Sequence, residues 1–485
     1  MSQHRIDYVL TSLAVATSGG AAHLRQPEVN REEFVDDFVI DLESIAVSEG
    51  KTDAIRRGIE RAIIEERLKP GDTLPTVRAL ADELGINKNT VAAAYRQLRD
   101  SGLISADGRK GSAVARHALL AASREIGGST LRTMAVRDGN PDPLFLPDEC
   151  EIRDAMGRIS VAHRLYGEQR NDAGFIEWAR AQFVEDKIDA SHGIFVSAGA
   201  LDAVERALTV ANLCPGDSVA VENPGYMCVH GLVHAMQLQP IPLDIDDNGV
   251  TPASLRRAIR AGAKAVIVTT RSHNPSGVVT SRARAAELKK LIDDGGDVLF
   301  IDDDHTNVLR LAGYNPWHMG ARRWLTIRSL SKTLGPDFRI AYSTGDAQTI
   351  DELEQRQNLG MGWVSNLLQR LVCELLRTSS VQRKIAAAGD AYRERHHLLT
   401  AALKKRGFDV RSGAGLNVWI PVSNEDEIIP RLIEAGWLVR SGRDLCVGKS
   451  SGIRVTAARM TASTVLGFAD ALATVRKAAS TAFTA

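Results

Sequence analysis

The apolar and polar positions of the chain follow different periods in two stretches. Between residues 51 and 101 the apolar positions recur every three or four residues, which is the spacing of amphipathic helices. From residue 194 onward, short continuous apolar runs alternate with helical stretches. Continuous apolar runs between helices are typical of a parallel sheet covered on both faces, so this stretch predicts an α/β fold.

Three helices are predicted in the first stretch. The first begins near Lys51 and ends at the breaker string KPGD. The second covers LPTVRALADELG, with Thr76 as a plausible N-cap and Gly85 as its stop. The third runs from Lys88 to Ser101, and Asn87 can cap it. This order of helices, with a tight turn before the last one, is typical of helix-turn-helix proteins.

Two short strands are predicted after the third helix, from Leu103 to Ser105 and from Ser112 to Ala115. The turn between them, DGRKG, carries two cations at its tip. A pair of strands in this position forms the wing of a winged helix, and cations at its tip suit contact with phosphates or the minor groove. The first stretch therefore predicts a winged helix-turn-helix domain that binds double-stranded DNA.

The candidate DNA contacts lie at the start of the third helix and at the wing tip. The last helix of such a domain lies in the major groove, where its first residues meet base edges. Here those residues are Lys88, Asn89 and Thr90, all of which can donate hydrogen bonds. Arg109 and Lys110 occupy the wing tip.

The remaining segments set the domain boundaries. Residues 1–47 have no assigned function and fit either a mobile tail or a tail with a short amphipathic helix. Residues 117–135 lack periodicity and contain a Gly-Gly-Ser-Thr break, which predicts a linker. The DNA-binding domain then covers residues 48–116, and a large domain covers residues 136–485.

Composition narrows the classes of protein. With 485 residues, 44% hydrophobic, 25% charged and no formal net charge, the chain is long enough for two or more domains, and any basic surface must be local. The five cysteines are scattered and lack C-x-x-C spacing, which argues against disulfides or a zinc site and favours the cytoplasm. We expect no metal, no signal peptide and no membrane span.

The candidate chemistry of the large domain centres on Lys332 in the string RSLSKTLGPDFR. An amine in a packed pocket loses its proton more easily than in water, and a neutral amine can condense with an aldehyde. Ser329 could hydrogen-bond a phosphate, and the planar fork of Arg339 could clamp it. Taken alone, the short string S-x-S-K also fits a surface lysine after a strand.

Four further motifs follow predicted strands, where ligands of parallel sheets collect. The string SAGA, from Ser197 to Ala200, opens a helix whose free N–H groups could hold a phosphate. Tyr226 could stack on a flat ring, and Asn274 could donate to a phenolic oxygen. One carboxylate of the run 302–304 could pair with a protonated pyridine nitrogen. That run also fits a metal cluster or a solvated turn, although adjacent side chains on an extended segment diverge.

Longer strings resemble known families. LP-x-x-R-x-LA followed by N-x-x-TV-x-x-A-Y-x-x-L resembles the GntR winged-helix family over residues 51–115. The motifs that lead to Lys332 resemble fold-type I aminotransferases over roughly residues 136–485. The two together resemble the MocR transcriptional regulators, and the strings GWVSNLLQ and GWLVRSG look most like those that control pyridoxal kinase and vitamin B6 metabolism.

These resemblances imply a role for particular residues. The GntR resemblance implies DNA contacts from Arg78, the start of the third helix and Gly111. The aminotransferase resemblance implies pyridoxal 5'-phosphate as cofactor, held as a Schiff base by Lys332. The other implied positions are Asp303 at the pyridine nitrogen, with Asp302 as the competing register; Asn274 and His305 near the phenolic oxygen; Tyr226 on the ring; Ser197, Ala200, Ser329 and Arg339 at the phosphate; Arg454 at a substrate α-carboxylate; and Asn140 near the substrate.

Two residues depart from the aminotransferase pattern. His305 stands where the family usually has tyrosine, which would make its hydrogen bond sensitive to pH. Leu201 stands where relatives often carry a polar residue. Both put efficient transamination in doubt, although half of such a reaction could remain.

We therefore expect a homodimeric transcriptional regulator that binds operator DNA and senses pyridoxal phosphate, an amine or an amino acid. Its winged helices could pack on their own large domains or be domain-swapped onto those of the partner. The alternatives are an active aminotransferase with an accessory DNA-binding domain, and a DNA-binding protein whose large domain has lost the cofactor.

Overall fold

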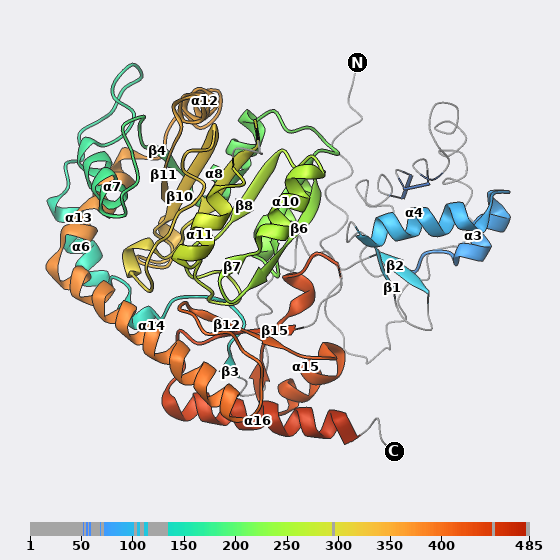
Figure 1. Cartoon of the computed structure of the whole chain (residues 1–485). Coiled ribbons are helices and arrows are strands. Elements are labelled where there is room, and N and C mark those ends of the chain that lie inside the picture. The colour runs from blue at the N-terminus through green and yellow to red at the C-terminus, as the bar shows by residue number, and fades with distance from the viewer. Residues whose placement is uncertain are drawn as a thin grey trace, which may run out of the picture. The chain divides into compact units, whose positions relative to one another are not determined.

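The chain forms two compact units, residues 1–115 and 116–485, in a computed structural model (Figure 1). Residues 1–47, most of the first predicted helix and most of the predicted linker lie outside the described residues. The described residues are 52, 55–56, 58–59, 68, 72–100, 104–106, 111–114, 134–292, 296–448 and 452–481.

The described part of the first unit has the last two predicted helices followed by the two predicted wing strands. Thr76 caps α3, since its side chain accepts a hydrogen bond from the Ala79 N–H, as the sequence predicted. The wing strands pair in antiparallel fashion, with Ile104 opposite Val114. The elements are α3 (Val77–Glu83), α4 (Lys88–Asp100), β1 (Ile104–Ala106) and β2 (Ser112–Val114).

A small core holds this unit together. Val91, Tyr95 and Leu98 recur on one face of α4 and are almost fully buried. The Tyr95 hydroxyl donates to the Pro75 carbonyl at 2.8 Å, so its polar end is satisfied within the core. This bond also fixes α4 against the segment that leads into α3.

The large unit is built on an eight-stranded sheet in the order β4-β11-β10-β9-β8-β5-β6-β7. The five central strands, β10, β9, β8, β5 and β6, run parallel, as the apolar runs predicted. The bounds are β4 (Phe195–Ser197), β5 (Ser218–Asn223), β6 (Gln239–Asp246), β7 (Gly249–Val250), β8 (Ala265–Val268), β9 (Leu299–Asp303), β10 (Arg323–Ser329) and β11 (Ala341–Gly345).

The sheet departs from the predicted parallel arrangement at β11. This strand runs antiparallel to both β10 and β4. The segment 330–340 that joins β10 to β11 contains only a short 3-10 helix, η5 (Pro336–Phe338), and is too short for a helical crossover. The chain therefore reverses directly, and Lys332 lies in this reversal.

Helices cover both faces of the sheet. Neighbouring residues of one strand contribute to different cores: Val266 and Phe300 pack on one side, and Ile267 and Ile301 on the other. Full burial on both faces explains why the strands read as continuous apolar runs. The helices of this part are α6 (Glu149–Arg158), α7 (Ala173–Glu185), α8 (Ala200–Val210), α9 (Met227–Ala235), α10 (Pro252–Arg260), α11 (Arg282–Lys289) and α12 (Ala347–Asn358).

The C-terminal part has its own sheet and core. The long helix α14 runs from α13 to α16, as Figure 1 shows. The small sheet has the order β12-β15-β14. The elements are α13 (Asn366–Arg377), α14 (Ser379–Lys405), β12 (Asn417–Pro421), α15 (Glu425–Glu434), β13 (Trp437–Leu438), β14 (Arg440–Ser441), η6 (Gly442–Asp444), β15 (Gly452–Thr456) and α16 (Ala462–Thr481).

The start of the large unit is bonded to this C-terminal part. The strand β3 (Met134–Ala135) lies at the end of the segment predicted to be a linker and pairs in parallel with β13. The next residue, Val136, donates to the Leu438 carbonyl at 3.0 Å and accepts from the Thr456 N–H at 2.6 Å. Residues 134–136 are therefore fixed to two strands of the C-terminal part.

Two general properties follow from the described residues. None of the helices described is both long enough and apolar enough to span a membrane. All five cysteines are described, and each is a free thiol.

Candidate functional site

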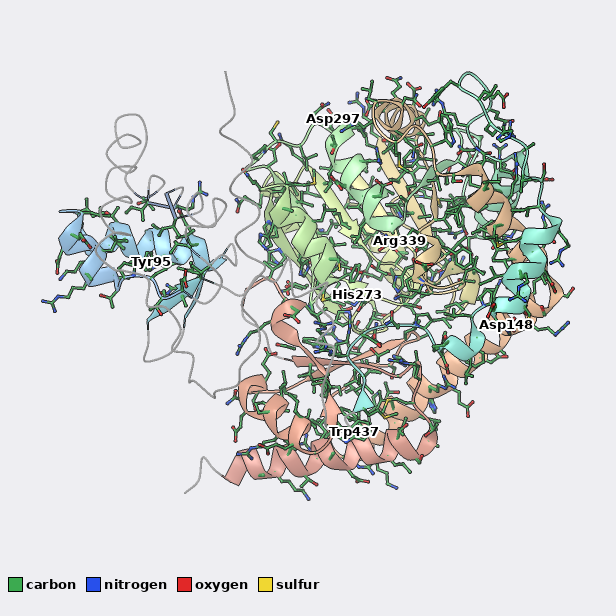
Figure 2. The ribbon with its side chains drawn as sticks, turned by 180° about the vertical axis from the view of Figure 1, so that it is seen from behind. Tyr95, Asp148, His273, Asp297, Arg339 and Trp437 are labelled. Carbon is green, nitrogen blue, oxygen red and sulfur yellow. The ribbon has the colours of Figure 1, made fainter. Side chains whose placement is uncertain are left out.

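A cavity of about 310 Å³ opens at the carboxyl ends of β5, β8, β9 and β10. Figure 2 shows Arg339 and His273 in the middle of the large unit, with Trp437 in its C-terminal part. Of the residues predicted for the large-domain site, the cavity wall contains Asn140, Ala200, Tyr226, Asn274, Asp303, His305, Ser329, Lys332, Arg339 and Arg454. Ser197 is not on the wall; it is fully buried and its hydroxyl donates to the Gly199 carbonyl at 3.1 Å.

The Lys332 amine points into this cavity from the β10–β11 connection. Its Nζ donates to the Gly139 carbonyl at 2.8 Å, which connects it to the segment predicted to pass near a substrate. Burial, together with the positive charge of Arg454, lowers the pKa of Lys332 to about 8. A sizeable fraction of the amine is therefore neutral, and nucleophilic, close to neutral pH.

Asp303 is the carboxylate of the acidic run that faces the cavity. The preceding Asp302 points elsewhere, since its oxygens accept from the Thr270 N–H at 3.0 Å and from the Tyr314 hydroxyl at 2.7 Å. The Oδ1 atom of Asp303 is buried and has no hydrogen-bond partner among the described residues. Burial and the charges of its two acidic neighbours raise the pKa of Asp303 to about 7. A cationic N–H at this oxygen would satisfy both the charge and the missing bond.

Asp304 belongs to a separate buried network. Its Oδ2 accepts from Arg271 at 2.6 Å and from Arg328 at 3.1 Å, and both arginines also bond Asp186. Although burial alone would raise it, these guanidinium groups keep the pKa of Asp304 below its usual value. The three carboxylates thus point to three different environments, and the metal cluster that the sequence left open does not form here.

The N-terminus of α8 makes a cradle for an anion. Gly199 is the N-cap and offers no side chain to the first N–H groups of the helix, which face the cavity at Ala200. The guanidinium of Arg339 closes this end and donates to the Ala198 carbonyl at 3.3 Å. A Cβ at Gly199 would lie 2.5 Å from Arg339 Nη2, and its φ of +103° also favours glycine. With Ser329 on the same wall, these groups suit a phosphate.

Three further predicted residues line the cavity: Asn274, His305 and Tyr226. The Asn274 Oδ1 accepts from Arg454 at 3.2 Å and from Asn417 at 3.4 Å, which leaves its amide N–H groups to donate into the cavity. Burial lowers the pKa of His305 to about 4, so the ring is neutral at neutral pH. The pH-sensitive hydrogen bond expected of His305 would therefore change only at acidic pH. Burial raises the pKa of Tyr226, whose phenol stays protonated.

Arg454 occupies the far side of the cavity on β15. Only 1% of its surface is exposed, and its Nη2 donates to the Arg137 carbonyl at 2.5 Å. Burial and the neighbouring Arg440 lower its pKa to about 10, so it stays cationic at neutral pH.

Several residues of the wall were not predicted from the sequence, among them Arg137, Cys228 and Arg440. Arg440 belongs to the string GWLVRSG, which carried the resemblance, yet nothing in the apolar pattern marks its side chain as facing a site. The pairing of β14 with β15, which places Arg440 opposite Arg454, is what reveals it.

The DNA candidates of the first unit lie on its surface where they are described. Arg78 on α3 is exposed, and so are Lys88 and Asn89 at the start of α4, while Thr90 is half-buried. The Asn87 side chain accepts from the Asn89 N–H at 2.8 Å, as expected of the cap.

The wing is described only in part. Gly111 directly precedes the return strand β2 and has a φ of +98°, which favours glycine. Arg109 and Lys110 lie outside the described residues.

The cavity fits pyridoxal phosphate at each of its functional groups. An amine of lowered pKa is available for the aldehyde, the unpartnered Asp303 oxygen for the ring nitrogen, and the α8 cradle for the phosphate. The Asn274 amide remains for the phenolic oxygen. These are complementary groups at separate places on one wall.

Two families match this chain. Residues 164–472 match "Aminotransferase class I and II", and residues 51–114 match "Bacterial regulatory proteins, gntR family".

Two relatives that are named as transcriptional regulators match this chain over most of their own length. The "Vitamin B6 salvage pathway transcriptional repressor PtsJ" of Salmonella typhimurium is 37% identical over 84% of this chain and 94% of its own. The "HTH-type pyridoxine biosynthesis transcriptional regulator PdxR" of Corynebacterium glutamicum is 25% identical over 73% of this chain and 78% of its own. Among solved structures, LysN, an alpha-aminoadipate aminotransferase of Thermus thermophilus complexed with N-(5'-phosphopyridoxyl)-L-leucine, has a TM-score of 0.63 at 18% identity, over 74% of this chain and 97% of that one. That likeness establishes the fold.

Proposed function

Because the chain belongs to the MocR-type transcriptional regulators, which join a gntR-family domain to an aminotransferase class I and II domain, we propose that it reports the occupancy of its pyridoxal phosphate site to operator DNA. The winged helix binds the DNA, and the large unit binds the cofactor and an effector. The observation that carries this proposal is the low-pKa Lys332 amine in one cavity with the unpartnered Asp303 oxygen and the α8 cradle.

Each part of the cofactor is assigned to groups of this chain. Bound pyridoxal phosphate supplies an aldehyde that reacts reversibly with amines, and a ring that withdraws electrons. Lys332 would hold the aldehyde, and Asp303 would accept a hydrogen bond from the proton-bearing ring nitrogen. The remaining assignments are the Ala200 N–H, Ser329 and Arg339 for the phosphate, Asn274 for the phenolic oxygen, Tyr226 and His305 for the ring wall, and Arg454 and Asn140 for the effector.

The effector changes the state of the large unit through Lys332. An effector amine would compete with the Lys332 Nζ for the aldehyde of the cofactor, and Arg454 would hold its carboxylate. A ligand shifts an equilibrium only by its difference in affinity for the two states, and this exchange supplies such a difference. The cofactor and the amine together therefore act as the signal.

The winged helix reads DNA with the surface groups of α3 and α4. Lys88, Asn89 and Thr90 meet base edges in the major groove, and Arg78 contacts the backbone. The wing contributes Arg109, Lys110 and the turn at Gly111, which binds phosphates.

A homodimer is supported by an exposed apolar patch. Large apolar side chains are exposed on α6, on the segment after it and around the start of α13. The ring of Tyr166, 93% exposed, packs edge-on against Trp363 at 5.6 Å between centroids. Patches of this kind mark protein interfaces. Its members are Met156, Val161, Leu165, Tyr166, Leu359, Met361 and Leu367. A second copy of this chain covers them, whether or not the winged helices are swapped.

The regulated genes belong to vitamin B6 metabolism. This part of the proposal rests on the names of the relatives PtsJ and PdxR and on the B6-derived cofactor assigned to the cavity. The protein acts in the cytoplasm, where its DNA lies.

A working aminotransferase is the second candidate. It is favoured by the joint presence of Lys332, Asp303 and Arg454 on one wall. Incubation with amino and keto acids separates the two candidates: turnover at ordinary enzyme rates without binding to upstream DNA would establish the enzyme.

Covalent attachment tests the proposed function. Purified full-length protein is incubated with pyridoxal phosphate, reduced with borohydride and analysed by peptide mass spectrometry, with binding to upstream DNA measured in parallel. We expect the label on Lys332, its loss in Lys332→Ala, and altered DNA affinity when the cofactor is bound. Lys264→Ala, a change at an exposed lysine paired with Asp217, is the matched control. Unchanged labelling in Lys332→Ala, or DNA binding that ignores the cofactor, would refute the proposal.

A further inference from the structure

Two arginines stand opposite one another at the edge of the cavity. In the antiparallel pairing of β14 with β15, Arg440 is the register partner of Arg454, and both line the cavity. Like charges at directly opposed positions of two strands destabilise a sheet. The proximity also lowers the pKa of Arg454. An arrangement with this cost is expected where an anion binds between or beside the two groups.

Both guanidinium groups retain unused donors. The Nε atoms of Arg440 and Arg454 are each buried without a hydrogen-bond partner among the described residues. Arg454 itself is 99% buried, so its missing bond is not made to bulk solvent. A buried donor without a partner is destabilising, and a bound anion would satisfy it.

The cavity also holds more positive charge than the proposed function uses. The phosphate of the cofactor accounts for one arginine, Arg339, and an α-carboxylate accounts for Arg454. Of the two acids on the wall, Asp303 is assigned to the cofactor and Asp138 already pairs with Arg459. The cations of the wall are Arg137, Lys332, Arg339, Arg440 and Arg454.

The local structure holds Arg440 in place. Its Nη1 bonds Asp444 Oδ2 at 3.2 Å, and its side chain is only 16% exposed. The buried Glu425 carboxylate fixes the turn that follows, since it accepts from the Ser441 hydroxyl at 2.6 Å and from the Gly442 N–H at 2.7 Å. The Arg440 fork is therefore pre-organised, and Asp444 occupies only one of its nitrogens.

We propose that Arg440 is a second anion subsite, which selects amine effectors that carry a further anionic group besides the α-carboxylate. This inference rests on the proposed function and names the class of its effector. The α-carboxylate binds Arg454, and the second group, a side-chain carboxylate or phosphate, binds Arg440. Amino acids with neutral side chains leave Arg440 without its ligand.

The test is equilibrium binding of a panel of amines to the cofactor-loaded full-length protein, followed by the absorbance of the bound cofactor and by calorimetry. The panel contains glutamate, aspartate and phosphoserine on one side and alanine and leucine on the other. A charge-assisted hydrogen bond lost from a buried site corresponds to about a 10- to 100-fold loss of affinity. We expect wild-type protein to prefer at least one dianionic amine by this factor, and Arg440→Gln to remove the preference while alanine binding stays the same.

Two further variants keep the test decisive. Arg443→Gln removes a positive charge from the neighbouring exposed residue and is expected to change nothing. Asp444→Asn removes the acid that competes for Arg440 and is expected to tighten the dianionic amines alone. If glutamate and aspartate bind more tightly than phosphoserine, Arg440 is a carboxylate subsite. If phosphoserine binds more tightly, Arg440 is a phosphate subsite.

The inference is overturned if Arg440→Gln weakens all amines equally, if it weakens none, or if wild-type protein binds no dianionic amine more tightly than alanine. Borohydride labelling of Lys332 in the same protein preparation, taken before any amine is added, separates this failure from that of the proposed function. If the protein is labelled but shows no preference, only the Arg440 subsite is refuted. If the protein is not labelled, the cofactor assignment itself is refuted.

Discussion

Burial of the Lys332 amine predicts that it reacts with an aldehyde at a pH where an ordinary lysine scarcely reacts. With the pKa lowered from 10.5 to about 8, roughly 9% of the amine is neutral at pH 7, against about 0.03% for a free lysine. The neutral fraction of Lys332 is therefore about 300-fold that of free lysine, and this factor applies to any step in which the neutral amine is the nucleophile. Attachment of pyridoxal phosphate should therefore rise with pH and level off above about pH 8.

The perturbation that tests this reasoning is Arg454→Gln. The positive charge of Arg454 is the second cause of the lowered pKa, after burial. Its removal favours the protonated amine, so the pKa of Lys332 rises and attachment at pH 7 slows. The matched control is Arg443→Gln, which removes the positive charge of an exposed residue that does not line the cavity.

The assay is stopped-flow absorbance of cofactor-free protein mixed with pyridoxal phosphate between pH 6 and 10. Each rate is divided by that of N-acetyl-lysine at the same pH, since the reagent also titrates and the ratio cancels this effect. A ratio that does not change with pH would place the Lys332 pKa near that of free lysine and refute the burial argument. A midpoint that falls in Arg454→Gln would refute the assigned role of its charge.

Three other changes have defined outcomes. Gly199→Ala should weaken cofactor binding about tenfold or more in a fluorescence titration, because its Cβ would lie 2.5 Å from Nη2 of Arg339, the residue proposed for the phosphate, whereas Gly216→Ala, with a similar φ but open space around it, should not. Asp304→Asn leaves two buried guanidinium groups short of a counter-charge and should cost about 3–5 kcal/mol in urea unfolding; a loss below about 1 kcal/mol would contradict the network. Arg109→Ala with Lys110→Ala should weaken DNA binding and flatten its salt dependence by up to about two phosphate contacts, and an unchanged slope would rule out the wing contact.

Local signals in the sequence predicted local structure well. The caps at Thr76 and Asn87 depend on a side chain and an N–H a few residues away, so the string alone contains the cause. Lys332 stood out because its neighbours are small and polar just after an apolar strand. A motif of this kind lies within a dozen consecutive residues, so the sequence alone can reveal it.

Features set by strand pairing could not be predicted in the same way. The sequence left Asp302 and Asp303 as competing registers, because β9 is buried on both faces and its apolar run gives no sign of which side faces the site. The antiparallel direction of β11 depends on the length of the connection between β10 and β11, and the apolar pattern gives no information about that length. Arg440 enters the site only because β14 pairs with a strand that follows it by a dozen residues.

The strand β3 gives the large unit an unusual point of attachment. The chain that arrives from the winged helix ends in two residues paired with Trp437 and Leu438, directly upstream of Arg440. One residue further on, Val136 bonds Leu438 and Thr456, and the Arg137 carbonyl bonds Arg454. The backbone of residues 134–137, where the large unit begins, is thus bonded both to β13 and to the cavity-lining Arg454, so a ligand that displaces Arg454 also breaks one of the bonds that hold the first residues of the large unit.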